Sequence, residues 1–205
     1  MSYDSYIHRA KPADTPGAPI LFVFHGTGGD ENQFFDFGGC LLPNATVISP
    51  RGDISEHGAA RFFRRKAEGV YDCEDLARAT NRMCDFVASN RERYDAGPVV
   101  GLGFSNGANI LASVLMEKPG LFDAAVLMHP LIPYEREVQP VSVKTRVLVT
   151  AGQNDPICPV ELTTQLADYF RRRDDEVELE WHPGGHELRP NEIEAAKKFL
   201  SRYKG

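Results

Sequence analysis

A short motif in the middle of the chain could make a serine reactive. It reads Gly103-Phe104-Ser105-Asn106-Gly107. The apolar run 98–102 precedes it and a helix-like run, 108–117, follows, which is the context in which G-x-S-x-G places a serine on a sharp turn between a strand and a helix. Such a turn holds the serine in a strained backbone conformation, and glycine at both ends relieves the crowding. The motif therefore predicts that Ser105 is a nucleophile. The alternative is an ordinary loop rich in glycine and serine.

A serine hydroxyl is a weak nucleophile at neutral pH, so it needs a base and an acid that orients the base. Two later segments supply these groups. Asp155 comes shortly after the apolar run 146–150, and His186 comes shortly after the run 177–181. Ligands of parallel sheets bind beyond the carboxyl ends of the strands, so we expect both side chains at the edge where Ser105 stands.

Each assignment has an alternative. Asp155 precedes a proline, which is typical of a turn. His182 competes with His186 as the base, but it lies within or just after an expected strand. Two glycines precede His186 and allow its loop to approach the serine closely. We expect His129, at the end of the run 124–128, to be structural.

An oxyanion formed at the serine needs two preorganised N–H donors. One is expected from the backbone of Asn106, which follows the nucleophile, and the other from the glycine-rich loop 25–30, where Thr27 is the favoured donor. The same loop could be read as a phosphate-binding loop, but it lacks the G-K-[ST] ending and the G-x-G-x-x-G spacing. His25 is expected to fix this loop by hydrogen bonds.

Short apolar runs alternate with helical patterns along the whole chain. The expected strands are 20–24, 46–48, 99–104, 124–128, 146–150 and 177–181, with a further edge strand at 5–8. The expected helices are 73–94, 105–118, 161–173 and 190–203. This alternation predicts an α/β fold in one domain, 1–205, with a mostly parallel central sheet, helices on both faces and no large lid domain.

Composition narrows the class of protein further. The chain has 205 residues, 42% of them hydrophobic, and a formal net charge of -6, which argues against nucleic acid as a partner. No apolar run is long enough to cross a membrane and the first residues lack a signal-peptide core, so a cytoplasmic location is expected. The four cysteines show no metal-binding spacing, so no metal and no cofactor is expected.

With these residues in hand, the chain resembles α/β-hydrolases of the phospholipase/carboxylesterase family over nearly its whole length. The motifs that carry the resemblance are 25–30, 103–107, 152–159 and 184–187, and the segment 61–72 is most similar to a bacterial branch of hydroquinone- or catechol-responsive hydrolases. The resemblance implies a Ser105–Asp155–His186 triad, oxyanion donors at Thr27 and Asn106, no cofactor, and a homodimer. Dienelactone hydrolases share the fold, but their nucleophile is cysteine, and Ser105 argues against that group.

The longest irregular stretch, 51–71, is expected to border the site. Its basic segment 61–66 suggests substrate contacts through four neighbouring residues: Arg61, Phe62, Phe63 and Arg64. An arginine would bind a carboxylate or phenolate and a phenylalanine would pack an aryl or short acyl group, although a solvated basic loop is equally compatible. A second apolar wall is expected from Met128, Leu131, Ile132 and Pro133.

The sequence thus predicts a serine carboxylesterase that hydrolyses short-chain or small aromatic esters through an acyl-enzyme on Ser105. Its partner would be a small-molecule ester. Two alternatives stay open. One is a lysophospholipase or acyl-protein thioesterase. The other is a hydrolase-fold protein that binds an aromatic compound without catalysis.

Overall fold

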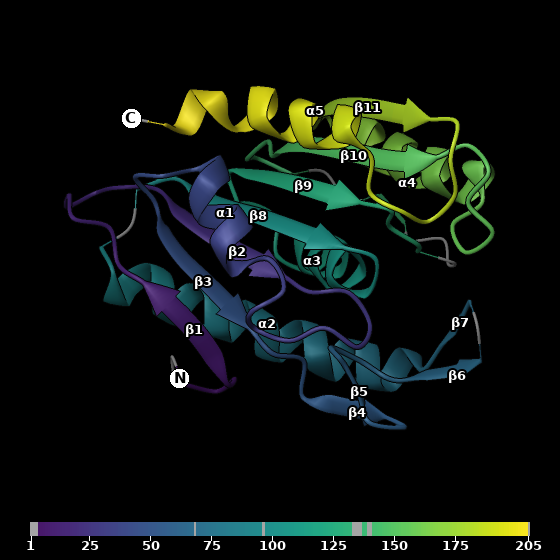
Figure 1. Cartoon of the computed structure of the whole chain (residues 1–205), viewed down its shortest axis with the longest axis horizontal. Coiled ribbons are helices and arrows are strands. Elements are labelled where there is room, and N and C mark those ends of the chain that lie inside the picture. The colour runs from purple at the N-terminus through teal and green to yellow at the C-terminus, as the bar shows by residue number, and fades with distance from the viewer. Residues whose placement is uncertain (1–3, 68, 96, 133–136, 139–140, 205) are drawn as a thin grey trace.

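A seven-stranded sheet forms the centre of the computed structural model, which describes residues 4–67, 69–95, 97–132, 137–138 and 141–204 (Figure 1). The strand order is β1-β3-β2-β8-β9-β10-β11. In that order the strands are β1 (His8–Lys11), β3 (Thr46–Pro50), β2 (Ile20–Phe24), β8 (Val99–Phe104), β9 (Ala124–Met128), β10 (Arg146–Gly152) and β11 (Glu176–His182). Only the pairing of β1 with β3 is antiparallel within this sheet, and the other pairings are parallel.

Helices cover both faces of the sheet (Figure 1). The helices are α1 (Phe35–Leu41), α2 (Cys73–Arg93), α3 (Asn106–Glu117), α4 (Val160–Arg172) and α5 (Pro190–Leu200), followed by a 3-10 turn, Ser201–Tyr203. Apolar residues of α2, α3 and α4 share one core cluster with the sheet, whereas those of α1 and α5 belong to a second cluster on the opposite face. No helix in the described part of the chain is long and apolar enough to cross a membrane.

Burial on both faces explains the unbroken apolar strands. All five residues of β2 are fully buried; Ile20, Phe22 and Phe24 point into the first cluster, and Leu21 and Val23 into the second. Successive side chains of a strand point to opposite faces, so a strand covered on both sides needs an apolar residue at every position. The fold predicted from the sequence, a mostly parallel sheet between two helical layers, is confirmed.

The structure differs from the expected elements at the edge and in the short segments. The edge strand lies at His8–Lys11 instead of 5–8, where it pairs with β3; Tyr6 is buried against Phe86 instead, with ring centroids 5.3 Å apart. The helix α1 was not expected from the sequence.

The stretch 51–71, expected to be irregular, contains two small hairpins. They consist of β4 (Ile54–Glu56) with β5 (Ala59–Arg61), and β6 (Arg65–Ala67) with β7 (Val70–Tyr71). Phe62 and Phe63 connect the two hairpins and are fully buried. The hairpins are therefore attached to the domain through the core, near the carboxyl end of the sheet (Figure 1).

Candidate active site

Ser105 occupies the sharp turn between β8 and α3. Its backbone has φ 52° and ψ -117°, the strained left-handed conformation expected for this motif. A Cβ atom on Gly103 would lie 2.5 Å from the carbonyl oxygen of Gly107, and one on Gly107 would lie 2.3 Å from that of Phe24. The Ser105 amide donates to the Met128 carbonyl at 2.9 Å and ties the turn to β9. Only glycine fits at both ends of the turn.

The structure brings Ser105, His186 and Asp155 into one chain of hydrogen bonds. The Ser105 Oγ lies 2.9 Å from His186 Nε2, and His186 Nδ1 lies 2.7 Å from Asp155 Oδ2. Asp155 follows β10 and His186 follows β11, so the parallel sheet delivers all three residues to one edge. With its Nδ1 proton donated to Asp155, the imidazole presents an unprotonated Nε2 to the serine hydroxyl.

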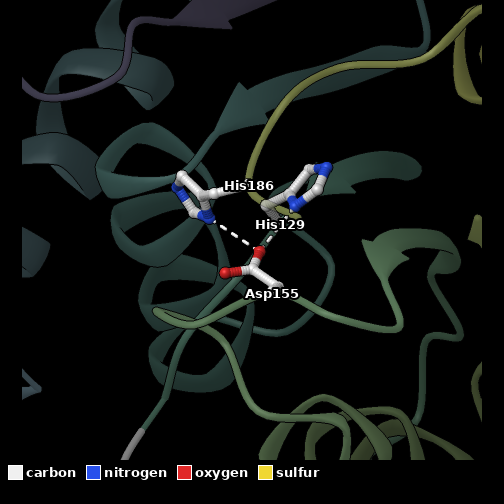
Figure 2. Close-up of side chains that lie close together, drawn as sticks. All are labelled: His129, Asp155 and His186. Atoms are coloured by element: carbon white, nitrogen blue, oxygen red, sulfur yellow. Dashed lines mark hydrogen bonds and ion pairs between the residues drawn. The ribbon is translucent and has the colours of Figure 1, made fainter. Parts of the chain in front are cut away.

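Asp155 is a completely buried carboxylate with four hydrogen-bond donors around it. Its Oδ1 accepts from the amides of Ile157 at 2.8 Å and Cys158 at 3.0 Å. Its Oδ2 accepts from the Nδ1 atoms of His186 and His129, the latter at 2.8 Å (Figure 2). Burial alone raises the pKa of Asp155, but these hydrogen bonds outweigh it and hold the pKa below its usual value. Asp155 is therefore ionised at neutral pH.

His129 takes part in the site through Asp155, a contact that the sequence did not reveal. Its second nitrogen, Nε2, lies 3.1 Å from Oε1 of Glu192 in the first turn of α5, and His182 Nε2 lies 3.2 Å from Oε2 of the same carboxylate. Both histidines and Glu192 are buried. The sequence held one indication of this contact. His129 directly follows β9, and β9 pairs with β10, the strand that leads to Asp155.

The two expected oxyanion donors lie at the same cavity as Ser105. Asn106 is the first residue of α3, where backbone N–H groups have no partner within the helix, and its side-chain Oδ1 accepts from the Phe62 amide at 2.8 Å. Thr27 Oγ1 accepts from Arg61 Nη1 at 2.8 Å. Donation from the Thr27 and Asn106 amides to an oxyanion stays a prediction.

His25 holds the loop that carries Thr27, as expected. Its Nδ1 lies 2.7 Å from the Gly26 carbonyl oxygen, and its Nε2 accepts from the Gly52 amide at 2.9 Å. One nitrogen donates and the other accepts, so the ring is neutral. Burial lowers the pKa of His25, which agrees with that assignment.

The cavity beside Ser105 measures about 290 Å³. Polar and apolar side chains both line it; the polar ones include Arg61, Arg65 and Asn109, and the mainly apolar ones are Tyr71, Phe104, Leu131 and Ile157. Arg61 and Arg65 share one carboxylate, Glu56, at 3.4 Å and 2.9 Å. The positive charges of both guanidinium groups therefore lie at the cavity.

Three of the four expected substrate contacts lie elsewhere. Phe62 and Phe63 point into the core and are fully buried, so they do not line the cavity. The Arg64 side chain is 63% exposed and faces Asp75. Of the expected contacts, only Arg61 lines the cavity, and the neighbouring Arg65 joins it. The reason is that Phe62 and Phe63 anchor the hairpins in the core, so neither ring can contact a ligand.

The second apolar wall is present only in part. Leu131 lines the cavity, whereas Met128 and Ile132 are buried without lining it. Pro133 lies outside the described residues, as does Glu68.

Within the described residues, two groups of side chains have the composition and spacing of metal ligands: His129 with Asp155 and His186, and His129 with His182 and Glu192. The hydrogen bonds argue against a metal in both. In the first group the two Nδ1 atoms already donate to Asp155. In the second, His182 Nδ1 accepts from the Gly184 amide at 3.0 Å, so its proton sits on Nε2, the atom that a metal would need.

The fold and the site together define an α/β-hydrolase of the esterase type. The chain belongs to the Dienelactone hydrolase family, whose model matches residues 74–193. From Ser105 alone, dienelactone hydrolases are not expected, because their nucleophile is cysteine. The family match shows that this expectation is wrong for the family, although the residue at the turn here is Ser105.

Relatives of known structure or name agree with this class. The chain is 35% identical to the hydrolase MhqD of Bacillus subtilis. The similarity covers 88% of this chain and 91% of MhqD. It is 33% identical to a Bacillus cereus carboxylesterase, with a TM-score of 0.92 over 98% of this chain and 95% of the other. It is 27% identical to YahD, solved with malic acid, with a TM-score of 0.88 over 97% and 100% of the two chains.

Substitution of Gly107 tests the packing of the turn. Gly107→Ala places a Cβ 2.3 Å from a backbone oxygen of β2, which cannot yield without moving the strand. We expect the free energy of unfolding to fall by about 1–3 kcal/mol, measured by urea denaturation.

Gly39 in α1 is the matched control, because no atom lies within 4 Å of a Cβ placed there. Gly39→Ala is expected to be neutral or to stabilise by up to about 1 kcal/mol. Equal effects of the two substitutions would contradict the close approach at Gly107.

Proposed function

We propose that this protein is a serine carboxylesterase that hydrolyses short-chain or small aromatic esters through an acyl-enzyme on Ser105. The observation that carries the proposal is the 2.9 Å contact between Ser105 Oγ and His186 Nε2, continued by the 2.7 Å contact of His186 with Asp155. A hydroxyl, a neutral imidazole and a buried carboxylate in this order form the arrangement that activates serine.

In the first half of the reaction, the Ser105 oxygen attacks the ester carbonyl carbon while His186 Nε2 takes the hydroxyl proton. Asp155 accepts a hydrogen bond from Nδ1 and stabilises the imidazolium that forms. The carbonyl oxygen becomes an oxyanion, which the amides of Thr27 and Asn106 bind. The intermediate collapses to the acyl-enzyme, and the departing alkoxide takes its proton from His186.

In the second half, His186 removes a proton from water, and the resulting hydroxide attacks the acyl carbon. The bond to the Ser105 oxygen breaks as His186 returns the proton to it, and the carboxylic acid leaves. The alcohol and the acid together account for the ester and one water molecule. His186 acts as base and acid in turn, so it must be unprotonated at the start of each half.

The cavity supports a small substrate. Its volume of about 290 Å³ lies at the lower end of the range for small-molecule sites. Tyr71, Phe104 and Leu131 offer apolar surface to an aryl or short acyl group. A long acyl chain would extend beyond this surface into solvent and gain little from burial.

Two guanidinium groups that line the cavity support an acidic group on the substrate. Arg61 is buried and also donates a hydrogen bond to Thr27, whereas Arg65 is partly exposed to solvent. A guanidinium can bind a carboxylate through two parallel hydrogen bonds, and a phenolate through its single oxygen. The related structure of YahD, which contains malic acid, is consistent with a carboxylate ligand for this fold.

Covalent labelling tests the nucleophile. A fluorophosphonate probe is expected to react with the Ser105 oxygen with loss of fluoride, and Ser105→Ala is expected to abolish labelling and lower ester turnover by at least about 1,000-fold. Mass spectrometry and a p-nitrophenyl butyrate assay measure the two effects. Ser201→Ala, at an exposed serine after α5, is the control and should label normally. A folded Ser105→Ala protein that keeps its activity would refute the proposal.

Acyl-chain length tests the substrate class. We expect kcat/KM for p-nitrophenyl acetate and butyrate to exceed that for the palmitate by at least about tenfold, because the cavity buries only a short chain. The opposite order would favour a lysophospholipase or an acyl-protein thioesterase. Binding of aromatic compounds without labelling or turnover would favour a non-catalytic binding protein.

Arg65 offers a test of the charged wall. Arg65→Gln is expected to raise KM several-fold for an ester that carries a free carboxylate, and to leave KM for its neutral methyl-capped analogue nearly unchanged. Arg64→Gln is the matched control, since Arg64 has the same charge but lies outside the cavity. If the two variants behave alike toward both esters, the wall does not select for charge.

A further inference from the structure

Behind the site lies a buried cluster of ionisable side chains that the reaction as described does not use. His129 stands between two carboxylates, Asp155 at 2.8 Å and Glu192 at 3.1 Å, and His182 contacts Glu192 from the other side at 3.2 Å. The side chains of His129, Asp155 and Glu192 are entirely buried. Each proton in such a cluster must have a defined place, because an unsatisfied buried polar group is costly.

The Glu192 carboxylate can only accept hydrogen bonds in this position. Its Oε1 accepts from the Thr150 hydroxyl at 2.6 Å, and its Oε2 accepts from the Arg189 amide at 2.7 Å. Hydrogen bonds from donors hold the pKa of Glu192 below its usual value, although burial opposes them. Glu192 is therefore ionised, as Asp155 is.

The proton of His182 is fixed by its other nitrogen. His182 Nδ1 accepts from the Gly184 amide at 3.0 Å, so it bears no proton. The proton of the neutral ring is then on Nε2, which donates to Glu192. His182 is satisfied without a charge.

His129 cannot be satisfied in the same way. Its Nδ1 and Nε2 each face an oxygen of an ionised carboxylate, and neither oxygen can donate (Figure 2 shows the Nδ1 contact). Its Nε2 also lies 3.4 Å from His182 Nε2, but Glu192 is the nearer partner of both nitrogens, at 3.1 Å and 3.2 Å. In a neutral ring, the lone pair of one nitrogen would face a buried carboxylate oxygen, which is an unfavourable electrostatic contact. Protonation of both nitrogens satisfies both contacts and gives an imidazolium between two anions. Burial lowers the pKa of His129, but its hydrogen bonds to Glu192 and Asp155 outweigh burial and raise the pKa above its usual value.

We propose that His129 is a buried imidazolium that positions the Asp155 carboxylate for His186 and offsets the charge of that carboxylate. This inference rests on the proposed function. His129 touches no substrate atom and acts through Asp155, so it is a positioning residue. Glu192 and His182 keep it protonated and in place.

The physical reason is competition for one oxygen. His129 and His186 both donate to Asp155 Oδ2, and their ring centroids are 5.1 Å apart. A second imidazolium at His186 would meet a like charge nearby and share an anion that is already balanced. The other groups that face His186 are Ser105, the Cys158 thiol at 3.8 Å and, across the cavity, the cations Arg61 and Arg65.

The same charge also opposes the imidazolium that His186 becomes during catalysis. Loss of the charge on His129 therefore need not slow the reaction at high pH. The distinctive effect is a displacement of the acid limb of the kcat/KM profile. A residue with only a structural role would lower the plateau and leave the limb in place.

Glu192→Gln removes the anion that holds the second proton of His129. The amide can donate to an unprotonated Nε2, so the ring becomes neutral while Nδ1 still donates to Asp155. We expect the midpoint of the acid limb to move up by about one pH unit, with the plateau changed by less than about tenfold. Asp175→Asn is the control, because Asp175 is a buried carboxylate paired with Arg173 at 2.6 Å and lies before the opposite end of β11. It should leave the limb unmoved.

His129→Asn tests the same charge from the other partner. Asn tolerates the φ of 52° found at position 129, and its amide nitrogen can donate to Asp155 in place of Nδ1. His129→Asn leaves Glu192 as a buried anion without an imidazolium partner. The double variant His129→Asn with Glu192→Gln removes this anion as well, and it replaces the single variant in the assay if the single variant folds poorly. We expect an upward shift of the limb in each. A limb that stays in place in these variants and in Glu192→Gln would overturn the proposal.

Nitrogen NMR on the unmodified protein decides the charge of His129 without turnover, so its result is independent of whether the protein is an esterase. We expect both ring nitrogens of His129 to be protonated at about pH 8, well above the ordinary histidine value. Glu192→Gln should leave one of them unprotonated. A singly protonated His129 in the unmodified protein, or a stoichiometric metal ion that Glu192→Gln releases, would overturn the inference.

Discussion

A negative charge buried without access to water is the constraint on which the site depends. The Asp155 carboxylate is stable in the interior only because four N–H groups point at it. Two of them are amides of its own turn. The other two belong to His129, which directly follows β9, and to His186, in the loop after β11. Three separate segments must therefore converge on one side chain, and their convergence fixes the orientation of His186 before any substrate arrives.

The parallel sheet makes this convergence possible. β8, β9, β10 and β11 are neighbours in the sheet, and each ends at the same edge with a residue of the site or just before one. Apolar side chains on both faces hold these strands in register. The loops that carry polar residues can then be short, and a displacement of one strand end would disturb every contact at the edge.

Sequence patterns were sufficient where local chemistry determines structure. Ser105 lies in a motif whose glycines allow one backbone shape, and Asp155 and His186 follow strong apolar runs, so their placement at one edge followed from the topology. The role of His129 could not be predicted, because its contact with Glu192 joins residues far apart in the chain. Periodicity missed α1, a short helix with two glycines, and it gave no sign that Phe62 and Phe63 face the core.

The turn between β8 and α3 fixes where the side chain at position 105 stands, whichever side chain it is. Gly103, Gly107 and the bond from the Ser105 amide to the Met128 carbonyl set the backbone, and none of them involves the side chain at 105. Exchange of the hydroxyl oxygen for sulfur would leave that backbone unchanged. A thiol at position 105 would therefore stand at the same edge of the sheet, beside the same imidazole.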